Sequence, residues 1–295
     1  MLQVKIGKKD AGKLLRQYLR DSLRLSSRYI KRLTREKRFL LINGQPVTVR
    51  YQLKEADTLT IKFPEETRSQ TMVVERVALD IVYEDDWLIV LNKKAKIPSI
   101  PSREHPTGTI ANGLLHYYEE KGIPYTVHIV TRLDKDTSGL MLVAKHQLSH
   151  SILSQKQRER KIERFYEALV EGVVKSDHGT INRPIRRKKT SIIEREVAPD
   201  GQEAITHYEV KRRYRKFTHV NIQLETGRTH QIRVHFSSIG HPLIGDGLYG
   251  NSDSVLTHHA LHCHTLKFHH PHTNELLTFH VDVPKTWLPF FSYGG

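Results

Sequence analysis

The chain has 295 residues, 38% of them hydrophobic, which is enough for one large or two unequal domains with buried cores. Its 47 lysines and arginines exceed its 32 acidic residues, and the formal charge of +15 favours a polyanionic partner, nucleic acid first. No apolar run approaches the roughly 20 residues of a membrane-spanning helix, and Met1 to Asp10 lacks the apolar core of a secretory signal. The single cysteine, Cys263, excludes an internal disulfide framework and is expected to be a small buried residue. We therefore expect a cytoplasmic protein without a membrane partner.

The first sixty residues predict a small module of helices and strands. Apolar residues at helical spacing after Asp10, a plausible N-cap, indicate one helix, and a second begins near Ser26. Strands are expected at residues 39–42, 47–49 and 58–63, with a turn at Asn43-Gly44. The second helix carries a basic stripe on the side away from the core, made of Arg28, Lys31, Arg32 and Arg35. Such a stripe is often a solvated helix face, but with this net charge it favours binding to phosphates.

A polar stretch over residues 64–76 predicts a linker and therefore a domain boundary. Beyond it, apolar segments predict strands at 79–83, 88–92, 127–130, 140–144, 165–173, 206–212, 218–225, 265–269 and 276–281. Helices are expected at 109–121, 148–160 and 229–239. Strands and helices do not alternate regularly, so the pattern predicts an α+β domain with a mixed sheet rather than a doubly wound one.

The most unusual local sequence is a polar loop between two apolar strands, residues 128–139, with Asp134 at its centre. Buried strands on both sides present a carboxylate rigidly, although Asp, Thr, Ser and Gly are also ordinary turn formers. Asp134 and Asp136 also resemble the phosphoryl-acceptor loop of haloacid dehalogenase-like phosphatases, in which a carboxylate attacks phosphorus beside a metal ion. Arg132 interrupts the apolar run before the loop, and no later acidic pair for magnesium is evident. The phosphatase remains the weaker alternative.

A second polar segment, residues 224–235, predicts a strand, a sharp turn at Gly227 and a helix capped by Thr229. Apolar residues every three to four positions form the buried side of this helix, and Arg233 points elsewhere. Arg228 and Arg233 could both be solvated. Alternatively, a guanidinium beside the loop carboxylate would keep that carboxylate ionised and aligned.

Seven histidines between residues 258 and 272, together with Cys263, suggest a zinc site at first sight. We expect none, because no four of these side chains have customary ligand spacing, and histidines that line a groove or lie at the surface are the simpler interpretation. Residues 245–250 match the pattern G-x-G-x-x-G, but no helix is expected after them, so a nicotinamide cofactor is not expected either.

Three segments, in this order, resemble the core motifs of the RluA family of pseudouridine synthases: Thr-Arg-Leu-Asp-Lys-Asp-Thr-Ser-Gly-Leu at 131–140, Arg-Phe-Tyr-Glu-Ala-Leu-Val-Glu-Gly at 164–172, and Gly-Arg-Thr-His-Gln-Ile-Arg-Val-His at 227–235. The resemblance extends over residues 77–283 and includes Asn92-Lys93 and Gly245-Asp246. Residues 1–63 are similar to the RNA-binding module named after small-subunit ribosomal protein S-four. The resemblance implies that module, the linker 64–76, and a catalytic domain at 77–295 whose large mixed sheet is mainly antiparallel.

The family isomerises uridine in RNA: the bond from N1 to the sugar breaks, the uracil turns, and C5 bonds to the sugar, without a cofactor or metal. The resemblance implies that Asp134 is catalytic, either attacking C1′ or removing the C2′ proton, and the sequence does not choose between them. Arg233 would pair with Asp134, and Tyr166 would stack on the flipped base and help to carry the C5 proton. Arg132 would fill the space that the extruded base leaves.

The resemblance also implies that Arg228 and His230 contact RNA, while the basic stripe adds salt-dependent affinity without reading the sequence. Ribosomal RNA is the expected substrate, transfer RNA the alternative, and a monomer the expected state. A non-catalytic RNA-binding or ribosome-assembly factor, in which Asp134 is only a loop former, also stays open.

Overall fold

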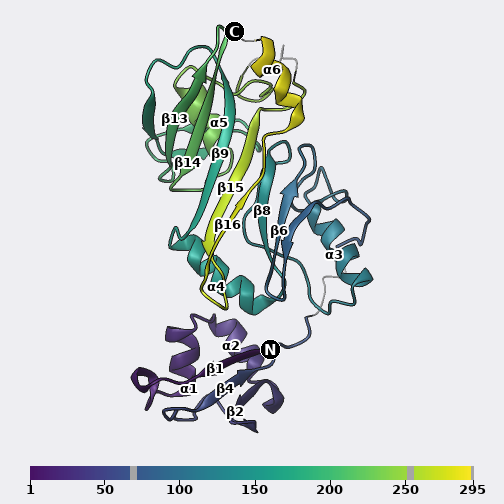
Figure 1. The fold of residues 1–295 in the computed structure, drawn as a ribbon, viewed down its shortest axis with the longest axis vertical. Helices are drawn as coiled ribbons and strands as arrows, with labels where there is room; N and C mark the ends of the chain where they lie inside the picture. Colours follow the sequence, from purple (N-terminus) through teal and green to yellow (C-terminus); the bar gives the residue numbers. More distant parts are fainter. Residues whose placement is uncertain (67–71, 251–255, 294–295) are drawn as a thin grey trace.

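The computed structural model describes residues 1–66, 72–250 and 256–293, which form a small N-terminal sheet and a large second sheet (Figure 1). The large sheet has ten strands, with eight in the order β10-β13-β14-β9-β15-β8-β6-β5, while β16 pairs with β15 and β7 with β8. Among these strands only β8 and β15 run parallel. The predicted α+β fold with a mixed, mainly antiparallel sheet is therefore confirmed. No helix in the described part of the chain is both long and apolar enough to cross a membrane.

The N-terminal module packs two short helices on a four-stranded sheet. Its elements are β1 (Leu2–Lys5), α1 (Leu15–Gln17), α2 (Ser27–Leu33), β2 (Leu40–Ile42), β3 (Gln45–Pro46) and β4 (Thr58–Ile61). α2 begins next to Ser26, as predicted, and Ser26 caps it, because its side chain accepts a hydrogen bond from the Tyr29 amide. Asp10 does not cap α1, which begins only at Leu15; its buried carboxylate instead pairs with Lys13 Nζ at 2.6 Å.

Two strand predictions in this module differ from the structure. β3 begins directly after the Asn43-Gly44 turn rather than at residue 47, because both turn residues have positive φ and return the chain within two residues. β1 was not predicted from the sequence; it pairs with β4 at the edge of the small sheet.

The strands of the large sheet follow the predicted segments closely at β5 (Ile81–Glu84), β6 (Leu88–Lys93), β7 (His128–Ile129), β8 (Ser138–Ala144), β9 (Ile162–Glu171), β13 (Ile205–Arg213), β14 (Phe217–Leu224), β15 (Leu261–His269) and β16 (Leu276–His280). Three further strands, β10 (His178–Asn182), β11 (Ile185–Arg187) and β12 (Arg195–Val197), were not predicted. Their sequences are largely polar, and β11 and β12 form a separate two-stranded hairpin.

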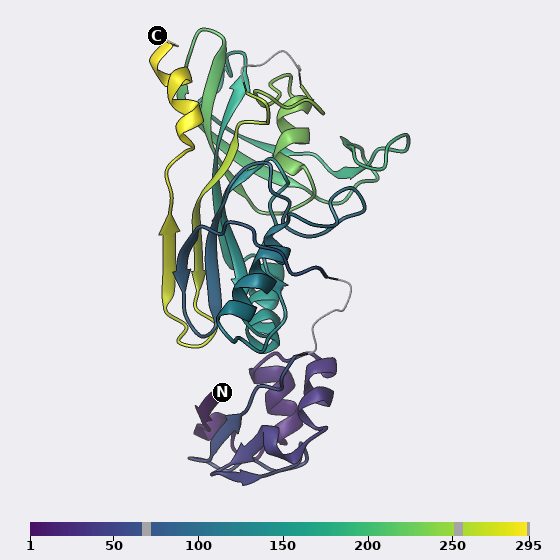
Figure 2. The same ribbon diagram turned by 90° about the vertical axis from the view of Figure 1, so that its right-hand side faces the viewer.

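Helices cover both faces of the large sheet. The predicted helices are present as α3 (Ile110–Glu120), α4 (Gln147–Arg158) and α5 (Gln231–Ser238), and α6 (Leu288–Tyr293) is additional. Side chains alternate along β9, so Tyr166 and Ala168 join the core that includes Ile232 of α5, while Leu169 joins Trp287 on the opposite face. The view along the sheet separates α5 from α6 in the same way (Figure 2). Tyr166 therefore faces the side on which α5 begins.

The N-terminal module lies against the end of the large domain that carries α4, in both views (Figures 1 and 2). One apolar cluster spans this junction and joins Tyr29 and Leu25 of the module to Trp87 and Leu148. Residues 67–71 of the predicted linker, 64–76, lie outside the described part of the chain. Glu66, just before them, is buried and accepts hydrogen bonds from the Gln147 and Thr126 amides.

Candidate active site

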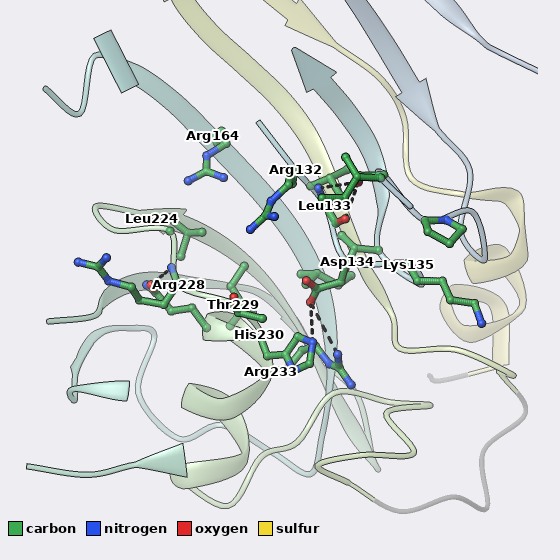
Figure 3. Close-up of a pocket in the computed structure, with 18 of the residues that line it drawn as sticks. Arg132, Leu133, Asp134, Lys135, Arg164, Leu224, Arg228, Thr229, His230 and Arg233 are labelled. Carbon is green, nitrogen blue, oxygen red and sulfur yellow. Dashed lines mark hydrogen bonds and ion pairs between the residues drawn. The ribbon is translucent and has the colours of Figure 1, made fainter. Parts of the chain in front are cut away.

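A pocket of about 710 Å³ opens where the loop between β7 and β8 meets β9 and the start of α5 (Figure 3). This volume is typical of a site for a nucleotide-sized ligand, for which roughly 300–1,000 Å³ is usual. Asp134 is the one acidic residue among those that line it, and its side chain is 28% exposed. The basic residues in the lining are Arg132, Lys135, Arg164, Arg195, Arg228 and Arg233. The pocket therefore combines a reactive type of group with a surface that attracts phosphates.

The loop that carries Asp134 is held at its first half by residues distant in sequence. Ser99 Oγ donates to the Leu133 carbonyl at 2.7 Å and accepts from the Leu133 amide at 3.2 Å. The buried ammonium of Lys93 donates to the Lys135 carbonyl at 2.8 Å. Burial lowers the pKa of Lys93 to about 7, although the nearby carboxylates oppose that shift. These contacts fix the backbone on both sides of Asp134.

The second half of the loop is held by two histidines. His259 Nε2 lies 2.7 Å from Thr137 Oγ1, and His262 Nδ1 lies 2.8 Å from Ser138 Oγ. Both imidazoles are buried, and burial lowers the pKa of each, so both are neutral at pH 7. The expectation that these histidines line a groove or lie at the surface is therefore wrong for His259 and His262.

Arg233 of α5 faces Asp134, as predicted, but a second carboxylate binds it more tightly. Its Nη1 lies 3.7 Å from Asp134 Oδ2, whereas Nε and Nη2 each donate to Asp246 at 2.7 Å. Burial opposes the ionisation of Asp246, but the hydrogen bonds and charge of Arg233 outweigh it and lower its pKa. Asp246 thus anchors the guanidinium and leaves one edge of it toward Asp134.

The turn before α5 is built differently from the prediction. Thr229 does not cap the helix; the N-cap is His230, with φ +57°, and its side chain makes no capping bond. Gln231, the first residue of the helix, holds the turn before it, because its Oε1 accepts from the Arg228 amide at 3.0 Å and from Thr226 Oγ1 at 2.8 Å. This turn places the His230 ring in the pocket, with Nε2 4.0 Å from Asp134 Oδ2 (Figure 3).

The other predicted residues take different positions around the pocket. Arg132 is exposed and points into it, and Tyr166 forms part of its buried wall. Burial raises the pKa of Tyr166, so its phenol stays protonated at neutral pH. Arg228 turns away from Asp134 and donates through Nε to the Glu203 carbonyl at 2.9 Å (Figure 3). Of the two arginines considered as partners of the loop carboxylate, only Arg233 is near it.

The basic stripe of the N-terminal module is divided in the structure. Arg28, Lys31 and Arg35 are exposed, as the prediction requires. Arg32 is half-buried at the junction, where it donates to Gln147 Oε1 at 2.9 Å and to the Glu65 carbonyl. Arg32 therefore contributes to the contact between the two parts of the chain.

Several residues of the site were not assigned a role from the sequence. Asp246 and Arg164 belong to the segments that carry the family resemblance. Their spacing did not predict that Asp246 binds Arg233 or that Arg164 lines the pocket. Tyr249, whose ring lies 5.0 Å from the Arg233 guanidinium, stood in the glycine-rich segment that was set aside as a false dinucleotide motif. Ser99 carried no signal, since a single serine in a loop is ordinary.

Comparison with known proteins identifies the class. Residues 87–238 match the family described as RNA pseudouridylate synthase. The chain belongs to this family, in agreement with its resemblance to the RluA enzymes, and it is an RNA pseudouridine synthase, an isomerase that acts on RNA. This result decides against the phosphatase and against a non-catalytic RNA-binding factor.

The similar proteins include two bacterial sequences and one human structure. The chain is 53% identical to the uncharacterized RNA pseudouridine synthase YjbO of Bacillus subtilis over 246 residues, which cover 83% of this chain and 87% of that one. It is 40% identical to ribosomal large subunit pseudouridine synthase D of Vibrio parahaemolyticus over 82% of this chain and 79% of that one. The solved structure of human RNA pseudouridylate synthase domain containing 1 superposes with a TM-score of 0.59 and 25% identity, covering 72% of this chain and 85% of that one.

Proposed function

We propose that this pseudouridine synthase modifies uridines of ribosomal RNA through the carboxylate of Asp134. The observation that carries the catalytic role is the position of Asp134: it is the one acidic group in the lining of a basic pocket, on a loop held from both sides. The name of the Vibrio parahaemolyticus relative, a ribosomal large subunit enzyme, supports ribosomal RNA as the substrate.

Two routes use the same carboxylate. As a nucleophile, Asp134 attacks C1′ and the N1–C1′ bond breaks; the uracil then turns, C5 bonds to C1′, and the carboxylate leaves. As a base, it removes the C2′ proton while the N1–C1′ bond breaks, which gives a glycal to which C5 adds before C2′ regains its proton. In both routes C5 loses a proton and N1 gains one, so the reaction is an isomerisation. Both need an accessible carboxylate, which the pocket provides, and Arg233 places a positive charge 3.7 Å from it.

The surrounding residues have supporting roles in this proposal. Arg132 takes the place of the extruded base, where its planar guanidinium replaces part of the lost stacking. Tyr166 packs against the uracil as a neutral phenol and can accept the C5 proton only if it passes its own proton on. Arg228 and His230 lie at the pocket, where Arg228 is free to meet a phosphate through its Nη atoms.

Release of tritium from RNA labelled at C5 of uridine measures the reaction directly, because C5 exchanges its hydrogen for a bond to carbon. We expect Asp134→Asn to release none while keeping its fold, as judged by circular dichroism. Asp136→Asn, in the same loop but outside the pocket lining, is the matched control and should keep activity within a few-fold of wild type. Full activity of Asp134→Asn would refute the catalytic role.

The substrate is tested by mapping pseudouridines in ribosomal and transfer RNA from a deletion strain. We expect sites in ribosomal RNA to disappear, and to return with the wild-type gene but not with Asp134→Asn. A loss confined to transfer RNA would replace the proposed substrate with the alternative one.

We further propose that residues 1–63 form an RNA-binding module similar to that of ribosomal protein S-four, followed by the linker 64–76 and the catalytic domain 77–295. Its exposed Arg28, Lys31 and Arg35 would contact phosphates. Each phosphate contact contributes roughly 0.7–0.9 to the slope of log affinity against log salt, so replacing all three residues with alanine should lower that slope by about 2–3. An unchanged slope would refute the assignment. We expect the enzyme to act as a monomer in the cytoplasm, which its mass in solution and cell fractionation would test.

A further inference from the structure

His230 joins Asp134 to a tyrosine behind the pocket. Its ring is 12% exposed, with Nε2 4.0 Å from Asp134 Oδ2 on one side and Nδ1 2.8 Å from the Tyr249 hydroxyl on the other. The left-handed backbone of His230 brings the ring to this place between the two side chains. An imidazole held in this way can present either an N–H or a lone pair to the carboxylate, depending on which nitrogen carries the proton.

The hydrogen bonds of Tyr249 select between these two tautomers. Its hydroxyl oxygen already accepts from the Arg195 amide at 2.7 Å. Burial raises the pKa of Tyr249 to about 12, so the hydroxyl keeps its proton. The described residues offer that proton one acceptor, His230 Nδ1. If Nδ1 carried a proton instead, the hydroxyl would have no acceptor there, and the Nε2 lone pair would face a carboxylate.

The imidazole is also better suited to a neutral form than to a charged one. Its ring faces Asp134, Arg233, Arg195 and Asp246; burial is the largest influence and lowers its pKa, and the two arginines act in the same direction. The two carboxylates oppose this shift without reversing it.

From this arrangement we propose that Tyr249 is a positioning residue that fixes His230 as a neutral imidazole with its Nε2–H directed at Asp134. This inference rests on the proposed catalytic role of Asp134. Arg233 and His230 both approach Oδ2 of Asp134. The gap of 4.0 Å is longer than a hydrogen bond and closes when the substrate fills the pocket, as contacts in empty active sites commonly do.

Tyr249 supports the second partner of Asp134 as well. Its ring lies under the Arg233 guanidinium, 5.0 Å from its centre, and its amide donates to Asp246 Oδ1 at 3.2 Å. Tyr249→Phe keeps the ring but removes the hydroxyl, so it separates the tautomer effect from the support of Arg233.

The tautomer is measured directly by nitrogen-15 NMR of histidine side chains, with the His230 signals identified by their loss in His230→Gln. We expect a neutral Nε2–H form at pH 7 in the wild type, and a mixture with the Nδ1–H form in Tyr249→Phe. A protonated imidazolium or an Nδ1–H form in the wild type would overturn the inference.

Activity provides a second, independent test. A glutamine amide occupies the place of Nε2 and can donate to Asp134, whereas an asparagine amide occupies the place of Nδ1. We expect the kcat of His230→Gln to be about tenfold higher than that of His230→Asn. A tenfold difference corresponds to about 1.4 kcal/mol, which is the contribution of one hydrogen bond. Asparagine suits a left-handed backbone better than glutamine, so impaired folding would produce the opposite order. Equal activities, or more activity in the asparagine variant, would overturn the inference.

Tyr249→Phe should lower kcat about five- to tenfold with an unchanged KM for RNA, because one positioning hydrogen bond is lost. Tyr118→Phe is the control: this tyrosine is buried in α3, its hydroxyl has no hydrogen-bond partner among the described residues, and its variant should match the wild type. An unchanged kcat in Tyr249→Phe would overturn the inference. These failures are distinct from failure of the proposed function, since an active Asp134→Asn would refute that function whichever tautomer His230 adopts.

Discussion

The ion pair between Arg233 and Asp246 should stabilise the fold, and the burial of both side chains sets the size of the expected effect. The two side chains are 9% and 0% exposed and share two hydrogen bonds of 2.7 Å. Removing one partner of a buried pair costs about 3–5 kcal/mol, because the remaining charge is left uncompensated. Asp134, 3.7 Å from Nη1, can take over part of the compensation. For Asp246→Asn we therefore expect the lower end, a loss of about 3 kcal/mol in the free energy of unfolding.

A matched exposed pair isolates the effect of burial. Arg213 and Asp177 are also 2.7 Å apart, but the Asp177 side chain is 80% exposed, and exposed pairs contribute about 0–1 kcal/mol. Urea unfolding followed by tryptophan fluorescence should show a large fall in midpoint for Asp246→Asn and almost none for Asp177→Asn. Thermal unfolding should fall by roughly 6–12 °C for Asp246→Asn, at about 2–4 °C for each kcal/mol. Losses within about 1 kcal/mol of each other would refute the reasoning from burial.

The loss of unfolding free energy in Asp246→Asn should depend on pH in one definite direction. Arg233 lowers the pKa of Asp246 in the folded protein against the opposing effect of burial. A carboxylate with a lowered folded pKa contributes stability above its unfolded pKa, about 3.9, and loses it as the pH falls through the folded pKa. The difference in unfolding free energy between wild type and Asp246→Asn should therefore be constant from neutral pH down to about pH 5 and shrink below about pH 4. A difference that grows on acidification would contradict this assignment.

Three further changes have expected outcomes. Gly139→Ala should give no soluble folded protein, or lower the unfolding free energy by more than about 4 kcal/mol. The reason is that φ of Gly139 is +108° and an added Cβ would overlap the Cys263 carbonyl oxygen. Soluble yield and thermal unfolding measure this effect. Glu167→Gln should destabilise the protein at pH 7 but not near pH 2 in urea titrations, because its ion pairs lower the pKa of Glu167 from 4.5 to about 2 despite burial. Arg32→Ala should release residues 1–63 faster in limited proteolysis, since it loses the bond to Gln147, whereas Arg28→Ala should leave the cleavage rate unchanged.

The architecture was predictable where burial leaves a strong pattern. β8 is buried at all seven positions, and residues 140–144 within it form a continuous apolar run, so its place was evident. β11 and β12 are short, rich in arginine and half-exposed, and no apolar alternation marks them. The edge strand β1 is similarly short. The mixed character of the sheet followed from the irregular order of elements, but the parallel pairing of β8 with β15 depends on segments more than a hundred residues apart.

The site was predictable only as far as its motifs extend. Asp134 and Arg233 were expected to meet, and their side chains do approach each other. The tighter partner, Asp246, follows the end of α5 in the chain and reaches back to it, which spacing does not reveal. Thr229 has a residue type that commonly caps helices, but α5 begins only at Gln231, so His230 occupies the N-cap position. The sequence therefore placed the N-cap of the helix within one residue, and the left-handed backbone of His230 decided where the helix begins.

The electrostatic arrangement is compatible with the proposed catalytic role of Asp134 in so basic a pocket. If Arg233 were free, it would form a close bidentate pair with Asp134 and occupy both of its oxygens. Asp246 takes two of the guanidinium nitrogens, so Asp134 keeps a compensating charge at 3.7 Å without a direct hydrogen bond. Of the other arginines, Arg132 points into the pocket, whereas Arg195 and Arg228 are held by backbone carbonyls. The loop contacts of Ser99 and His259 hold the carboxylate in place, and in the proposed reaction the arginines around the pocket would attract the phosphates of the RNA.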